Sequence, residues 1–163
     1  MSTRAKKIFL LLSVVVPFLV YSIIYYAPMI RNAPFKAEEF VSLSYSWGLG
    51  AHLDNHYNSA TGEYHYINAH DSLVVKHFKL DADAIKELDK AAHVQGFFNL
   101  PGVMSNDETS LQSPDKVRFE ITLNYQRKSK KVIFVSDFQG NEKMKDAFIQ
   151  TQKVLEGILS DSE

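Results

Sequence analysis

The 163-residue sequence has no cysteine and almost no net charge. Without cysteine, the chain cannot form disulfides, use thiolate catalysis, carry a lipid-modified cysteine, or hold zinc or iron–sulfur centres through thiolates. The formal net charge of −1 gives no basic excess that would favour a nucleic-acid partner.

Short catalytic motifs are also missing from the sequence. It contains no H-E-x-x-H, G-x-S-x-G, Walker or G-x-G-x-x-G pattern. Gly48-Leu49-Gly50 is a lone GxG, which is more typical of a strand-ending turn than of a phosphate-binding loop. We therefore expect neither an enzyme nor an organic cofactor.

One long hydrophobic run, residues 8–30, contains no charged side chain. As a helix it would extend about 34 Å, which is enough to cross a hydrocarbon core of about 30 Å. Tyr21, Tyr25 and Tyr26 lie toward its far end, where aromatic rings favour the lipid headgroup region. The run predicts a transmembrane helix, and a cleaved signal peptide is the alternative.

The basic residues around this run predict its orientation. Arg4, Lys6 and Lys7 precede it, which favours a cytoplasmic N-terminus and an exported C-terminal domain in the inner membrane. The expected cytoplasmic tail, transmembrane helix, linker and exported domain cover residues 1–7, 8–30, 31–39 and 40–163. Residues 31–163 carry 15 Lys and Arg against 19 Asp and Glu, so we expect no strong binding to anionic lipid through net charge.

Apolar and polar residues alternate along several segments of the expected exported domain. Residues 40–47 place Val41, Leu43, Tyr45 and Trp47 between serines, a period-two pattern that predicts a half-buried strand. Further strands are expected at either side of a turn over 59–62 and at residues 72–80, 117–126 and 131–137.

Helical spacing marks two later segments. Asp81 is a suitable N-cap and Gly96 a natural stop for the first helix, and a second helix is expected over about residues 141–159. Residues 102–116 are rich in turn residues and predict a loop. The order β-β-β-β-α-β-β-α, with short links, predicts an α+β domain in which two helices pack on one face of an antiparallel sheet.

The turn over 59–62 makes a specific register prediction: His56 faces His65 across the hairpin. Strand alternation would then place four metal-binding side chains on one face: His52, Asp54, His56 and His65. Imidazole and carboxylate groups suit zinc, copper or nickel. The alternatives are a solvated polar face and a pH-responsive interface.

Two other groups of residues are candidate interaction surfaces. An aromatic set could bind a sugar or peptide, or form a core layer beneath the helices: Trp47, Tyr57, Tyr64 and Tyr66, with Tyr45 beside them. A basic turn could contact acidic partners or lipid headgroups, or be a solvated hairpin tip: Arg127, Lys128, Lys130 and Lys131.

Three stretches together resemble a small domain of unknown function found in bacterial membrane-anchored proteins and lipoproteins. They are the serine-alternating strand with its glycine turn (residues 42–50), the Gly62-Glu63-Tyr64 hairpin, and KLDADAIKELDKAAHVQGFFNLPG (residues 79–102). The likeness covers roughly residues 40–137. Members often carry cysteines near the first turn, whereas this chain has none.

We therefore expect an uncharacterised single-pass membrane protein whose exported domain is a binding or interaction module in the cell envelope. Its expected partners are the bilayer, through residues 8–30, and an unidentified envelope protein or small ligand. One alternative is an exported metal-binding protein that uses the histidine hairpin. Another is an accessory subunit of a membrane complex that acts through its transmembrane helix.

Overall fold

A computed structural model describes residues 3–31 and 34–162 of the chain. The chain divides into two compact units, Met1–Phe35 and Lys36–Glu163, and each is described by itself. Parts of the expected tail and linker (residues 1–2 and 32–33), and the side chains of Tyr25 and Tyr26, lie outside the described residues.

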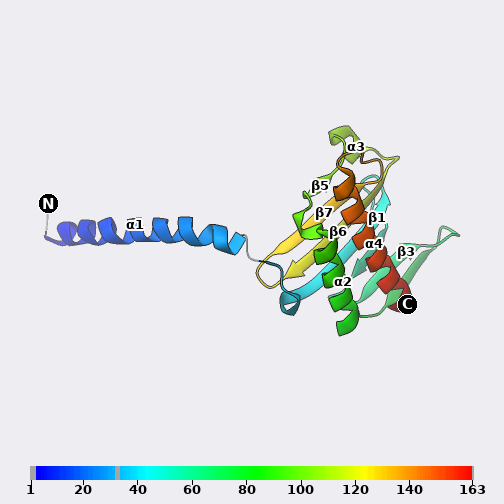
Figure 1. Cartoon of the computed structure of the whole chain (residues 1–163), viewed down its shortest axis with the longest axis horizontal. Coiled ribbons are helices and arrows are strands. Elements are labelled where there is room, and N and C mark those ends of the chain that lie inside the picture. The colour runs from blue at the N-terminus through cyan, green and yellow to red at the C-terminus, as the bar shows by residue number, and fades with distance from the viewer. Residues whose placement is uncertain (1–2, 32–33, 163) are drawn as a thin grey trace. The chain divides into compact units, whose positions relative to one another are not determined.

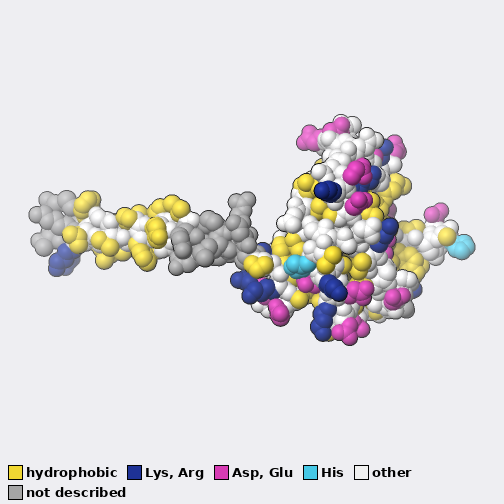
Figure 2. Space-filling model, in the orientation of Figure 1, with side chains coloured by type: hydrophobic (Ala, Val, Ile, Leu, Met, Phe, Trp, Pro, Cys, Tyr) yellow, Lys and Arg dark blue, Asp and Glu magenta, His cyan; other side chains and the backbone are white. Residues whose placement is uncertain are grey.

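The described part of the first unit contains one helix, α1 (Thr3–Arg31; Figure 1), and Pro17 lies within its range. Its segment Lys7–Ile24 has a mean hydropathy of 2.4, and none of that segment is buried. By length and composition α1 can cross a membrane, as the hydrophobic run predicts, although a signal sequence has the same properties. Figure 2 shows hydrophobic side chains along this helix, whereas charges of both signs are scattered over the second unit.

The second unit contains seven strands, three α-helices and two short 3₁₀ helices among its described residues. In chain order they are η1 (Ala37–Glu39), β1 (Phe40–Leu49), β2 (Asn55–Asn58), β3 (Glu63–Ile67), β4 (Leu73–His77), α2 (Ala82–Gln95), η2 (Phe97–Asn99), β5 (Val103–Met104), α3 (Glu108–Gln112), β6 (Val117–Tyr125), β7 (Ser129–Val135) and α4 (Glu142–Ser162).

All seven strands form one sheet in the order β4-β3-β2-β1-β6-β7-β5. The α+β class is confirmed, but the prediction of a purely antiparallel sheet is wrong at one edge. Val103 pairs with Ile133 in a parallel arrangement, so the segment expected to be a loop contributes strand β5 and helix α3. The sequence does not predict this strand because two residues are too few to show the apolar–polar alternation of a strand.

Helices α2 and α4 cover one face of the sheet and pack against each other (Figure 1). The rings of Phe134 on β7 and Phe148 on α4 stack at a centroid distance of 4.6 Å. Tyr125 Oη on β6 donates a buried hydrogen bond to Asp89 Oδ1 on α2 at 2.6 Å. The largest fully buried side chains of the unit include Leu43, Tyr45, Tyr57, Leu88, Phe97, Met104, Ile121, Leu123, Phe148 and Leu155.

The ends of α2 follow the signals in the sequence. The Asp81 carboxylate accepts a hydrogen bond from the Ala84 amide at 2.8 Å and so caps the first turn. Gly96 ends the helix in the left-handed conformation, with φ of 79°, which a residue with a Cβ atom rarely adopts.

Candidate functional site

The β2–β3 hairpin has the register that its turn predicts. His56 pairs with His65, and Tyr57 pairs with Tyr64. Gly62 closes the turn with φ of 77° and donates its amide to the carbonyl of Asn58 at 2.8 Å. The hairpin therefore separates a histidine face from an aromatic face.

The four predicted metal ligands are not gathered into one group. Strand β2 begins only at Asn55, so His52 and Asp54 lie in the β1–β2 connection rather than on a strand with His56. The chain turns at Gly50, where φ is 60°, and this turn overrides the alternation seen in the sequence. Within the described ranges no three His, Asp or Glu side chains are placed to hold a metal ion. Zinc binding stays a prediction.

His56 contacts a serine on the neighbouring strand. Its Nδ1 atom lies 2.9 Å from Ser46 Oγ, within hydrogen-bonding distance. Burial lowers the pKa of His56, the charge of His65 lowers it further, and Glu63 acts in the opposite direction. Burial, and then the neighbouring His65, therefore disfavour the charged form of His56.

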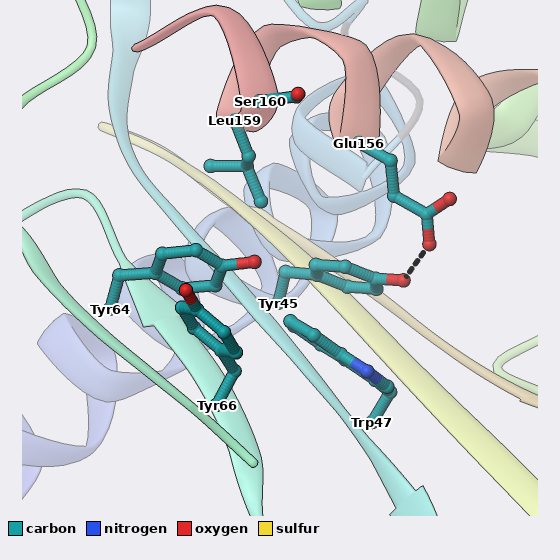
Figure 3. A pocket seen from close by; sticks show the side chains of 7 residues that line it. All are labelled: Tyr45, Trp47, Tyr64, Tyr66, Glu156, Leu159 and Ser160. Atoms are coloured by element: carbon teal, nitrogen blue, oxygen red, sulfur yellow. Dashed lines mark hydrogen bonds between the residues drawn. The ribbon is translucent and has the colours of Figure 1, made fainter. Parts of the chain in front are cut away.

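The aromatic face borders a cleft of about 300 Å³ between the sheet and the C-terminal part of α4. Figure 3 shows Tyr64 and Tyr66 at one side of the cleft, Tyr45 and Trp47 at the other, and α4 above them. The lining residues are Tyr45, Trp47, Tyr64, Tyr66, Glu156, Leu159 and Ser160. This volume is at the lower end of the range typical of small-molecule sites, roughly 300–1,000 Å³.

Ring packing fixes the walls of this cleft. Trp47 stacks on Tyr45 at 4.6 Å with an interplanar angle of 23°, and Tyr64 lies 5.0 Å from Tyr66. Trp47, Tyr64 and Tyr66 are only half-buried, although Tyr45 is fully buried. A rigid aromatic surface is therefore open to solvent at the side of the sheet that the helices otherwise cover.

Helix α4 adds a carboxylate to the aromatic walls. Tyr45 Oη donates a hydrogen bond to Glu156 Oε1 at 2.6 Å, and Gln152 Nε2 donates to the same oxygen at 2.8 Å. Burial raises the pKa of Tyr45, and its hydrogen bond to Glu156 raises the pKa further. Tyr45 therefore remains a neutral donor, and Glu156 is held at the edge of the cleft.

No family model, curated protein or solved structure matches this chain. The resemblance to the bacterial membrane-anchored domain stays a prediction. Any functional conclusion depends on the geometry of the cleft itself.

The residues that line the cleft differ from those that the sequence predicts for the aromatic surface. Tyr57 is fully buried and its ring stacks on Phe78 at 5.1 Å, so it contributes to the core rather than to a contact surface. Glu156, Leu159 and Ser160 were not predicted as site residues. Their spacing places them on one turn of a helix, but the sequence does not show that this turn lies over Tyr45 and Trp47.

The predicted basic turn makes contacts within its own unit. Arg127 forms an ion pair with Glu39 at 2.7 Å, and Lys131 pairs with Glu120 at 2.6 Å. Lys130 donates a hydrogen bond to a backbone carbonyl in the segment after α2. These contacts tie the β6–β7 hairpin to the start of β1 and to the sheet, and they leave less charge available for a partner.

Proposed function

We propose that this chain is a single-pass membrane protein of the bacterial envelope that binds a ligand or partner in the aromatic cleft. In this proposal α1 stays in the inner membrane with its N-terminus in the cytoplasm, and the Lys36–Glu163 unit is exported. The cleft is the observation that supports the binding role.

Three properties favour the cleft over the other candidate surfaces. It is concave, its walls include the half-buried rings of Trp47, Tyr64 and Tyr66, and its edge carries a carboxylate. Aromatic rings supply a large contact area with little conformational entropy to lose, because their neighbours already hold them in place. A binding partner would therefore gain contact without reorganising the cleft.

Site-specific photo-cross-linking in the native membrane tests this proposal. A photoreactive residue replaces Ser160, an exposed residue that lines the cleft. The matched control replaces Gln150, which is exposed on the same helix but does not line the cleft. We expect an adduct from position 160 and not from position 150.

A cleft variant makes this experiment specific. Trp47→Ala combined with Tyr66→Ala removes one ring from each side of the cleft and should abolish the adduct from position 160. Circular dichroism and protease resistance check that the variant still folds. Equal adducts from both positions, or none from position 160, would contradict a binding role for the cleft.

A further inference from the structure

The charge of the cleft has one source. Among its lining residues only Glu156 has a carboxylate, which is charged at neutral pH, and its side chain is exposed. Its two hydrogen-bond donors, Tyr45 and Gln152, are both neutral. No ion pair within the described part of the chain involves Glu156. The negative charge at the edge of the cleft therefore lacks an ion-pair partner among the residues that the structure describes.

The aromatic walls favour the same sign of ligand charge. The face of an aromatic ring is electronegative and attracts a cation placed within about 6 Å of its centroid. The ring of Tyr66 already has a cation of the domain beside it, because Lys76 Nζ lies 5.7 Å from its centroid. The Glu156 carboxylate and the ring face of Trp47, on the side of the cleft opposite Tyr66, thus favour a cationic ligand.

We propose that the cleft binds a quaternary ammonium group, with its methyl groups against Trp47 and its charge near Glu156. This inference rests on the proposed function, because it names the ligand class of the same cleft. It follows from the charge complementarity between a cation and a carboxylate at the edge of an aromatic hollow.

The hydrogen-bonding groups of the cleft distinguish a quaternary from a primary ammonium. A primary ammonium has three N–H donors that must find acceptors when it leaves water. Glu156 Oε1 already accepts from Tyr45 and Gln152, and four of the seven lining residues are aromatic. A quaternary ammonium has no donors to satisfy, so it loses less when it is desolvated there.

The only tryptophan of the chain makes this inference measurable. Because Trp47 lines the cleft, its fluorescence reports on this site without a label. Tetramethylammonium chloride is titrated into the full chain in a maltoside detergent, which carries no ammonium group, with sodium chloride keeping the ionic strength constant. We expect a saturable change in Trp47 emission.

Two further probes define the chemistry. Methylammonium, a primary cation, should bind more weakly than tetramethylammonium, and tert-butanol, a neutral molecule of similar size, should give no saturable change.

Glu156→Gln keeps an oxygen that can accept from Tyr45 but removes the charge, and it should weaken tetramethylammonium binding by about tenfold. Glu142→Gln, at an exposed position in the first turn of α4, is the matched control and should bind as the wild type does.

Each opposite result overturns the ligand assignment. The first is a change in Trp47 emission no larger than sodium chloride produces. The second is equal affinity for tetramethylammonium in Glu156→Gln and the wild type. The third is binding of methylammonium or tert-butanol that is as tight as binding of tetramethylammonium. Urea unfolding of Glu156→Gln separates lost binding from lost folding. If cross-linking from Ser160 still depends on Trp47 and Tyr66, the cleft remains a binding site and only its ligand class is wrong. If that cross-linking also fails, both proposals fall.

Discussion

The hydroxyl of Tyr45 and the carboxylate of Glu156 lie 2.6 Å apart and connect two segments that are 111 residues apart in the sequence. Tyr45 is in the middle of the first strand, and Glu156 is near the end of the last helix. Their hydrogen bond fixes α4 over β1 at the point where the cleft forms. It therefore links the stability of the fold to the shape of the candidate site.

Tyr45→Phe should test this link. The substitution keeps the ring but removes the donor to Glu156, and we expect the free energy of unfolding to fall by about 1 kcal/mol. The loss is moderate because Glu156 is exposed and water can replace the donor. Tyr66→Phe is the control, since no hydrogen bond of its hydroxyl occurs within the described residues, and it should change stability by less than about 0.5 kcal/mol. Urea unfolding measures both, and equal effects would contradict the assigned role of Tyr45.

The histidine pair predicts a dependence of stability on pH. The pKa of His56 in the folded chain lies below its ordinary value of about 6.5, chiefly because of burial and then because of His65. The unfolded chain therefore takes up the proton first as the pH falls. Stability is fully present above about pH 6.5 and is lost as the pH falls through the folded pKa.

Urea unfolding at about pH 7.5 and about pH 5.5 checks this sign. His56→Gln should reduce the loss of stability at the lower pH. His70→Gln, at an exposed position in the turn between β3 and β4, is the control and should lose as much stability as the wild type does. A wild-type chain that is equally stable at both pH values would argue against the effect of the pair.

Zinc titration can test the metal hypothesis residue by residue. The fold pairs His56 with His65 but places His52 and Asp54 in the preceding connection. If zinc binds, we expect its affinity to depend on His65 and to be unaffected by His52→Gln. Calorimetry of an untagged chain measures this affinity. Equal losses in His65→Gln and His52→Gln would contradict this placement and show that both histidines bind the ion.

The lack of cysteine provides a direct test of membrane orientation. A single cysteine is introduced at Ser2, in the expected cytoplasmic tail, or at Ser129, an exposed residue of β7. With a membrane-impermeant maleimide and intact spheroplasts, we expect labelling at position 129 only. Labelling at position 2 only would reverse the orientation, and a chain found shortened in the soluble fraction would identify residues 8–30 as a cleaved signal peptide.

The sequence predicts the elements that have a strong local signal. Alternation identifies β1 and β6, the four-residue turn sets the register of His56 against His65, and the carboxylate of Asp81 marks the start of α2. Each of these features depends on residues that are near one another in the chain. Local steric and hydrogen-bonding preferences are therefore sufficient to predict them.

The missed features depend on contacts between distant residues. Strand β5 has only two residues, and its parallel pairing with β7 is set by the tertiary fold. The alternation of His52 and Asp54 suggests a strand, but the backbone turns there because of Gly50. Glu156 enters the site only because α4 crosses the sheet beside Tyr45. No local pattern encodes that crossing.

Native mass spectrometry of the full chain, released from its own membranes in a mild detergent, tests most directly whether the aromatic cleft holds a ligand. We predict a bound mass on the wild-type chain and on Glu142→Gln, and its loss when Trp47 and Tyr66 are both replaced by alanine. A spectrum without a bound mass, or one that is the same in the cleft variant, would contradict the account.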